Sequence, residues 1–384
     1  MTPTIQMRPG DPAPWFKAHC GTNPNYSFDT VAGRYVLLAF FGPADGEMAR
    51  VCRAAIAGNR ELFDDDKLCF FGITSDPRER AEPHCPTVLP GIRYFFDADL
   101  AVAKQFGAFE QGPDSQSNAY RCFWLVLDPM LRVVGRVAFT TDDRHVAAIM
   151  SLLRRLPPVD HHAETVQFAP VLVLPRVFEP DLCRRLIGYY DDQGGKESGF
   201  MRDVGGKTVG IVDRAHKQRF DCTIEDEDLR NAARSRIERR LIPEIRKCFQ
   251  FKVTRMERYI VACYDAESGG HFNAHRDDTT FGTAHRRFAC TINLNAESYQ
   301  GGDLSFPEFG TRQYRAPTGG AVVFSCSLLH KVHKVTDGKR YAFLPFLYDE
   351  AAARVRAQNN ARLGEDVGEY RGLTPQQPAA SPAA

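Results

Sequence analysis

The strongest constraint on the fold is a break between two differently patterned halves of the chain. Residues 157–168 begin Pro-Pro-Val-Asp and carry no apolar period. Before this break, residues 34–41 and 67–74 are almost continuously apolar, and after it residues 288–295 alternate between apolar and polar positions. A chain of 384 residues also exceeds one ordinary core. The sequence therefore predicts domains at 1–156 and 169–350, a linker at 157–168, and a partly disordered tail at 351–384.

The first half alternates buried strands with helices. Its predicted strands are residues 34–41, 67–74, 92–96, 120–127 and 132–139, and its predicted helices are residues 48–63, 99–106 and 142–156. The last two strands flank an Asp-Pro turn and predict a hairpin. This order predicts an α/β sandwich.

The opening residues 10–16, Gly-Asp-Pro-Ala-Pro-Trp-Phe, and this order of elements resemble the peroxiredoxin family, which has a thioredoxin-like fold. The resemblance covers about residues 8–156. It implies a cysteine after Pro-x-x-x-Thr/Ser-x-x, at a helix start that stabilises the thiolate. Here Glu47 and Arg50 occupy the hydroxyl and thiol positions, and Cys52 lies two residues later. We therefore predict a degenerate domain without the peroxidatic cysteine; a redox thiol at Cys52 is the alternative.

The second half combines helices with strands that have one polar face. Residues 181–190 and 224–249 have helical periodicity, and Pro243 is expected to kink or end the second helix near Leu241. Residues 288–295 alternate between apolar and polar side chains, as a barrel strand facing a ligand cavity requires. The other predicted strands are residues 171–177, 258–264, 303–306, 321–325 and 340–347.

Three residues of this half have the donor types of an iron site. His275 and Asp277 stand at positions i and i+2, which point to the same side of an extended chain. His330 follows a strand and can complete a facial triad that leaves three positions open on Fe(II). Arg340, ten residues later, can bind a carboxylate through two N–H donors. The sequence predicts iron at His275, Asp277 and His330, with Arg340 anchoring the far carboxylate of 2-oxoglutarate.

Each of these assignments has an alternative. Asp278 could replace Asp277, although it would point to the other side of a strand. His333 could replace His330, since both follow the same apolar strand. Lys339 could replace Arg340, although a forked guanidinium suits a carboxylate better.

A longer series of residues carries a family resemblance. In order, these are Tyr264, Gly270-His271-Phe272, His275-x-Asp277, Arg287-Phe288, Gly301-Gly302-Asp303-Leu304, Pro317 to Phe324, His330 and Arg340. The series is similar to the catalytic core of the prolyl-4-hydroxylase-like Fe(II)/2-oxoglutarate dioxygenases and covers about the last half of the chain. It implies an α+β double-stranded β-helix, or jelly roll, with flanking helices.

This resemblance also implies an activity. Enzymes of the family hydroxylate a C–H bond with Fe(II), 2-oxoglutarate and O2, with ascorbate as a candidate further requirement; a protein or peptide prolyl residue is the family's example of a substrate. Relatives often have a tyrosine that helps hold 2-oxoglutarate where this chain has Asn293. Tyr264 is a candidate compensating donor, so the expected 2-oxoglutarate residues are Arg340, Tyr264 and Asn293.

Composition narrows the possible partners, cellular setting and function of the protein. The net charge is +1, so no nucleic-acid or membrane partner is expected. No run of 18 apolar residues is present, so no transmembrane helix is expected. The first residues lack a positive end followed by an apolar core, so a signal peptide is not expected either. The 11 cysteines form no Cys-x-x-Cys pair, which predicts reduced thiols in the cytoplasm. The expected partner is a small-molecule or protein/peptide substrate, with a homodimer left open. The alternative functions are a thiol-dependent peroxidase and a non-catalytic binding scaffold.

Arginines near the expected mouth of the site suggest one further property. Arg286, Arg287 and Arg312 could favour an acidic or carboxylate-bearing substrate. Solvated surface charge is the other interpretation of the same residues.

Overall fold

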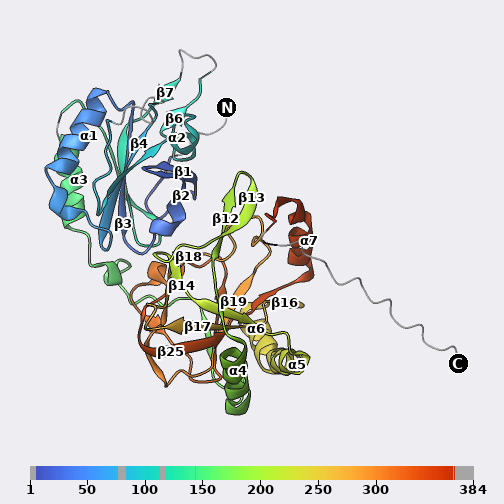
Figure 1. Cartoon of the computed structure of the whole chain (residues 1–384). Helices are drawn as coiled ribbons and strands as arrows, with labels where there is room; N and C mark the ends of the chain where they lie inside the picture. The colour runs from blue at the N-terminus through green and yellow to red at the C-terminus, as the bar shows by residue number, and fades with distance from the viewer. Residues whose placement is uncertain (1–5, 77–83, 113–117, 143, 366, 368–384) are drawn as a thin grey trace. The chain divides into compact units, whose positions relative to one another are not determined.

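The computed structural model describes residues 6–76, 84–112, 118–142, 144–365 and 367. The chain forms two compact units (Figure 1). The first comprises Met1–Ala169 and Phe306–Arg312, and the second comprises Pro170–Ser305 and Gln313–Ala384. None of the helices in the described ranges has the length and apolarity needed to span a bilayer.

The first unit is built on a seven-stranded sheet in the order β2-β1-β5-β4-β3-β8-β9. Its strands are β1 (Lys17–Cys20), β2 (Asn23–Ser27), β3 (Tyr35–Gly42), β4 (Leu68–Thr74), β5 (Ile92–Phe96), β8 (Phe123–Leu127) and β9 (Val133–Ala138). The strands β3, β4 and β5 are parallel, whereas β8 and β9 are antiparallel additions. Every residue of β3, β4 and β8 is buried, as their near-continuous apolar sequences require.

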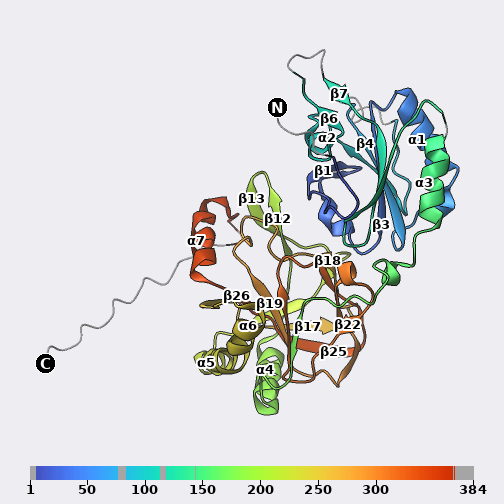
Figure 2. The same cartoon turned by 180° about the vertical axis from the view of Figure 1, so that it is seen from behind.

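Helices cover both faces of this sheet, which confirms the predicted α/β thioredoxin-like architecture. Helices α1 (Glu47–Ala57) and α3 (Arg144–Arg154) lie together on one face, and α2 (Ala101–Gln105) lies on the other (Figures 1 and 2). Ile56 of α1 and Ile149 of α3 share a core with β3. A short pair, β6 (Phe109–Glu110) and β7 (Ala119–Tyr120), completes the described strands of the unit.

Cys52 is an interior residue of α1. Its side chain is fully buried, and burial raises the pKa of its thiol well above the ordinary value. Arg50, at the position where peroxiredoxins carry the reactive thiol, is exposed on a different side of the helix. A thiol that is buried and protonated is a poor nucleophile, so this geometry disfavours a peroxidase centred on Cys52.

The second unit consists of two facing antiparallel sheets. The larger has ten strands along the path β10-β23-β19-β25-β17-β15-β11, with β16, β20 and β26 attached, and the smaller has the order β14-β18-β24-β21-β22. The larger-sheet strands are β10 (Leu172–Leu174), β11 (Lys196–Glu197), β15 (Phe220–Thr223), β16 (Arg255–Glu257), β17 (Ile260–Asp265), β19 (Phe288–Asn293), β20 (Tyr299–Gly301), β23 (Ala321–Ser325), β25 (Val335–Phe343) and β26 (Phe346–Tyr348). The smaller-sheet strands are β14 (Lys217–Gln218), β18 (His271–His275), β21 (Leu304–Ser305), β22 (Gln313–Tyr314) and β24 (His330–Val332).

The chain crosses repeatedly from one of these sheets to the other, which confirms the predicted double-stranded β-helix. The strands β17, β19, β23 and β25 of the larger sheet alternate along the sequence with β18, β21 and β24 of the smaller one. A separate hairpin pairs β12 (Phe200–Val204) with β13 (Lys207–Ile211).

Three helices pack on the outer face of the larger sheet, in agreement with the predicted flanking helices (Figure 1). They are α4 (Pro180–Gln193), α5 (Glu227–Arg236) and α6 (Ile242–Phe249). A π-helical turn, Ile237–Leu241, joins α5 to α6, and Pro243 lies in the first turn of α6. The interruption therefore falls at Leu241, because Pro243 has no N–H to continue the helical bonding.

Two features of the C-terminal part differ from the sequence-based picture. The last strand, predicted at 340–347, is divided into β25 and β26, because Pro345 has no N–H for the ladder. A helix, α7 (Glu350–Gln358), occupies the start of the predicted tail. Residues 368–384, which include the expected disordered end, lie outside the described residues.

Thiol labelling tests this account of Cys52. Of the 11 cysteines, Cys248 is the exposed one. We expect a maleimide to modify Cys248 within minutes in the native protein and Cys52 only after denaturation, as peptide mapping by mass spectrometry would show. Rapid native labelling of Cys52, together with peroxide consumption that is lost in Cys52→Ser, would contradict this and restore the peroxidase alternative.

Candidate metal centre and carboxylate pocket

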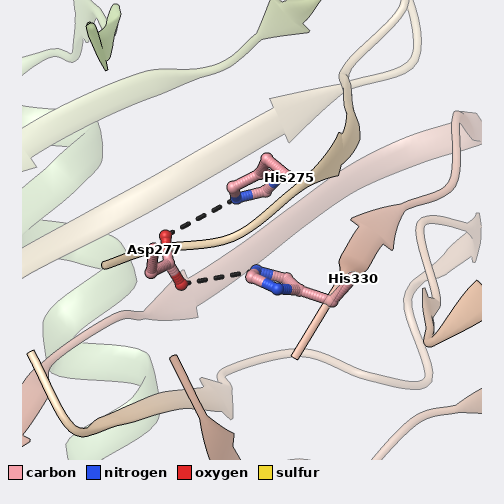
Figure 3. A group of neighbouring side chains, drawn as sticks. All are labelled: His275, Asp277 and His330. Carbon is pink, nitrogen blue, oxygen red and sulfur yellow. Dashed lines mark ion pairs between the residues drawn. The ribbon is translucent and has the colours of Figure 1, made fainter. Parts of the chain in front are cut away.

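Strand register places two histidines opposite each other in the smaller sheet. His275, the last residue of β18, pairs with His330, the first residue of β24. Asp277 follows two residues beyond β18, and its N–H donates to the carbonyl of Cys326 over 2.9 Å. Its carboxylate faces both rings, with Oδ1 3.6 Å from Nε2 of His275 and Oδ2 3.4 Å from Nε2 of His330 (Figure 3).

Backbone carbonyls fix the orientation of both rings. Nδ1 of His275 lies 2.8 Å from the carbonyl of Asn273, and Nδ1 of His330 lies 3.0 Å from the carbonyl of Leu328. Because a carbonyl can only accept, each Nδ1 is assigned the proton and each Nε2 presents a lone pair. Phe272 stacks on His275 with ring centroids 3.5 Å apart. The rings are therefore held with their free nitrogens toward Asp277.

The donor set fits a divalent metal ion. One ligand atom from each of His275, Asp277 and His330 can be chosen so that all three lie within 4.8 Å of one another. Among the residues that the structure describes, no other group of three histidine, cysteine or acidic side chains meets this criterion. Two imidazole nitrogens and one carboxylate oxygen on one face are the donors of non-haem Fe(II) oxygenases.

The protonation states suit metal binding. Burial would raise the pKa of Asp277, but the neighbouring His330 and His275 more than offset this, and the pKa lies well below its usual range. Burial and the nearby His275 lower the pKa of His330 to about 4. At neutral pH the carboxylate is ionised and His330 is neutral, as ligands must be.

The rival side chains have other partners. Asp278 accepts a hydrogen bond from the hydroxyl of Ser327, and Nε2 of His333 lies 2.8 Å from the hydroxyl oxygen of Ser305. Nδ1 of His271 lies 2.8 Å from a backbone carbonyl. None of the three joins the group formed by His275, Asp277 and His330 in the described structure.

Arg340 lies in the interior of the same unit. It pairs with Tyr264 across β25 and β17, and it is 2% exposed. Its Nη2 donates to the hydroxyl of Thr291 over 3.0 Å and lies 3.5 Å from Oδ1 of Asn293. Its Nε and Nη1 have no hydrogen-bond partner in the described structure. A buried cation with unused donors is costly, and a carboxylate is its natural acceptor.

The other two expected 2-oxoglutarate residues lie beside this guanidinium. The guanidinium carbon of Arg340 is 5.1 Å from the centre of the Tyr264 ring. The Tyr264 hydroxyl accepts a long bond of 3.4 Å from Nη1 of Arg219, which leaves its own proton available for donation. Asn293 donates through Nδ2 to the carbonyl of Ala316 over 2.7 Å, so part of its donor capacity is already used.

Sequence reasoning missed two contributors to this pocket. Thr291 lies on the polar face predicted for its strand, two residues before Asn293, and that alternation was the signal that it could face the pocket. Gly302 has φ +70, and a Cβ there would lie 3.1 Å from Cδ of Arg340. The glycine therefore leaves room for the arginine stem.

Residues 259–348, which contain the three potential metal ligands and Arg340, match the family model described as the 2OG-Fe(II) oxygenase superfamily. The C-terminal unit contains a 2OG-Fe(II) oxygenase domain. The match covers the strands from β17 to β26 and leaves the first unit and the preceding helices outside it.

Curated relatives match part of this chain over part of their own length. A PKHD-type hydroxylase of Thioalkalivibrio sulfidiphilus is 35% identical over 78 residues, which are 19% of this chain and 35% of that protein. A PKHD-type hydroxylase of Pseudomonas fluorescens is 32% identical over 127 residues, which are 31% of this chain and 54% of that protein. The chain spans 32% to 55% of the length of such relatives.

Two groups of solved structures are similar to this chain at low sequence identity, prolyl hydroxylases and peroxiredoxins. A prolyl hydroxylase from Trichoplax adhaerens, in complex with a hypoxia inducible factor peptide, is 15% identical with a TM-score of 0.39, covering 57% of this chain and 97% of that one. Peroxiredoxin Q of Xanthomonas campestris is 13% identical with a TM-score of 0.32, covering 36% of this chain and 89% of that one. The assignment of the two folds rests on the strand orders described above.

The lowered pKa of His330 predicts how metal-free protein responds to acid. An unfolded histidine titrates near pH 6.5, whereas His330 in the folded protein has a pKa of about 4. The unfolded state therefore binds the proton first, and stability present above pH 6.5 is lost as the pH falls toward 4. The loss attributable to His330 is up to about 3 kcal/mol.

Denaturant unfolding of the metal-free protein at a series of pH values measures this loss. The variant His330→Gln should show a smaller loss of unfolding free energy over the same window. An unchanged pH dependence in that variant would contradict the assignment.

Proposed function

We propose that this protein is an Fe(II)- and 2-oxoglutarate-dependent dioxygenase that hydroxylates a C–H bond. His275, Asp277 and His330 would hold the iron, and Arg340, Tyr264 and Asn293 would hold 2-oxoglutarate. The observation that carries the proposal is the pair of unused donors on buried Arg340, inside the domain that also presents a three-residue metal face. The metal face would bind the keto-acid end of 2-oxoglutarate, and Arg340 would bind its far carboxylate.

When bound, Fe(II), 2-oxoglutarate and O2 would supply the oxidation, with one oxygen atom of O2 ending in the hydroxylated product and the other in succinate, formed from 2-oxoglutarate with loss of CO2. The protein's side chains provide binding and orientation. The carbonyls of Asn273 and Leu328 hold the two imidazoles in the tautomer that binds a metal. Arg340 fixes the far carboxylate, and its burial excludes water from that bond.

The proposal also covers the class of substrate and the cellular compartment. The match to PKHD-type hydroxylases supports hydroxylation, and a prolyl residue in a peptide or protein is the first substrate to test. All eleven cysteines are free thiols, which supports a cytoplasmic setting. No observation favours a scaffold function over catalysis.

Metal binding tests the ligand assignment. His275→Ala removes one of three protein ligands, so we expect Fe(II) affinity under anaerobic titration to fall by more than about 100-fold, beyond the loss typical of outer-shell changes. His333→Ala, which removes a histidine bonded to Ser305, should bind iron normally. Equal affinities in the two variants would refute the assignment.

Co-substrate turnover tests the role of Arg340. Arg340→Gln removes the charge that would face the far carboxylate, so the KM for 2-oxoglutarate should rise at least about 30-fold. Succinate formation with Fe(II) and O2 measures this. Lys339→Gln is the matched control, because Lys339 is about half exposed and pairs with Asp265. A normal KM in Arg340→Gln, or the absence of iron-dependent succinate from the unmodified protein, would count against the proposal.

A further inference from the structure

A second group of buried cations lies in the oxygenase domain. Arg219 and Arg258 form ion pairs with Asp221, and Lys217 interacts electrostatically with the same carboxylate. Nε and Nη2 of Arg219 each lie 2.7 Å from an oxygen of Asp221, and Nη2 of Arg258 lies 3.0 Å from Oδ2. Lys217 and Arg219 are each 4% exposed. We call these four residues the basic cluster.

The basic cluster adjoins both parts of the proposed active site. Lys217 pairs with Phe272 in register, and its ammonium lies 5.0 Å from the Phe272 ring, which stacks on His275. Arg219 donates to the hydroxyl of Tyr264, whose ring also lies beside the guanidinium of Arg340. Phe272 is therefore a shared neighbour of Lys217 and His275, and Tyr264 is a shared neighbour of Arg219 and Arg340.

Charge balance shows that 2-oxoglutarate does not account for this cluster. The Fe(II) ion and Arg340 would bring three positive charges. Asp277 and the two carboxylates of 2-oxoglutarate would bring three negative charges, so that part of the site is neutral when filled. The basic cluster still has three cations and one carboxylate. When Lys217 is protonated, the two positive charges in excess of Asp221 are costly in this largely buried site unless a further anion arrives.

Lys217 has donor capacity for such an anion. Its ammonium donates to the Ser198 hydroxyl over 2.7 Å and to the Gly199 carbonyl over 2.5 Å. These are its two acceptors in the described structure, and an ammonium has three N–H donors. Burial, and next the charge of Arg219, depress the pKa of Lys217 well below its usual value, so an anion beside it would be needed to keep it charged.

The arginines that the sequence placed near the mouth do not supply this site. Nε of Arg286 donates to buried Glu257 over 2.8 Å, and Nη1 of Arg287 donates to the carbonyl of Ala284 over 2.9 Å. The guanidinium of Arg312 lies 4.4 Å from the Phe168 ring. Each has a partner of its own, whereas the basic cluster has an excess of charge next to the metal face.

We propose that the substrate of this dioxygenase is an acid whose carboxylate binds Lys217, supported by Arg219 and Arg258, while its reacting C–H bond faces the iron. This inference rests on the proposed function and specifies its substrate class. The carboxylate belongs to a small acid or to an acidic group of a peptide, and both sources share the same recognition chemistry.

Extract from the cells that make the protein can reveal the charge of the substrate before its identity is known. Extract is added to the protein with Fe(II), 2-oxoglutarate and O2, and succinate above the extract-free level is measured. A quaternary-ammonium resin at pH 7 should remove the stimulating component, and a salt wash should return it. Size filtration of the returned fraction then separates a small acid from a peptide.

The outcomes distinguish this inference from the function on which it rests. Stimulation that passes through the resin, or no stimulation by any fraction despite extract-free, iron-dependent succinate, overturns the acid substrate alone. Loss of stimulation after alkaline phosphatase assigns the anion as a phosphate ester and overturns the carboxylate. No iron-dependent succinate under any condition overturns the dioxygenase itself.

A variant that removes the charge of Lys217 tests whether the anion binds at the basic cluster. Lys217→Gln should need at least tenfold more of the returned fraction for half-maximal stimulation, while its KM for 2-oxoglutarate stays within about twofold of the unmodified value. Lys252→Gln, which removes an exposed lysine, should respond like the unmodified protein. An unchanged response in Lys217→Gln would overturn the proposed contact. The resin experiment uses the unmodified protein and does not depend on the folding of either variant.

Discussion

The pairing of β18 with β24 is the contact on which the proposed chemistry depends. This register sets His275 opposite His330, and the chain leaving β18 then brings the Asp277 carboxylate to the Nε2 atoms of both rings. Two backbone carbonyls fix the tautomers, and Phe272 covers one ring. Because the side-chain period of a strand is two, a slip of one residue would turn a ligand away from the others. The neighbouring strands β14 and β21 pair with β18 and β24 on their outer edges.

Uncompensated positive charge is the second organising feature of the oxygenase domain. Arg340 has two buried donors without partners, and the basic cluster around Asp221 has two more cations than carboxylates. Such an arrangement costs stability in a protein that binds nothing there. In an enzyme that binds a dicarboxylate and an acidic substrate, the same arrangement gives affinity and fixes orientation. In the first unit, by contrast, the candidate reactive residue Cys52 is buried in an apolar core cluster.

Local sequence pattern was sufficient for much of the fold. Continuous apolar runs predicted β3 and β4, alternation predicted β19, and Pro243 marked the interruption at Leu241, because each signal depends on neighbours in the chain. The division of the last strand at Pro345 was missed although its cause is equally local. The helix α7 was also missed, since a short helix of low apolar content gives a weak periodic signal.

By itself the sequence determined the types and spacing of the candidate residues: two histidines, one carboxylate and an arginine ten positions after the second histidine. Tertiary structure decided which copies of each type converge, turning Asp278 toward Ser327 and His333 toward Ser305. It also assembled the basic cluster, whose members come from β14, β15, the single residue between them and the segment before β17. Contacts between strands that are distant in sequence depend on the strand register. The charged side chains of the basic cluster come from such strands and the segments beside them, so no local sequence pattern predicts that they meet.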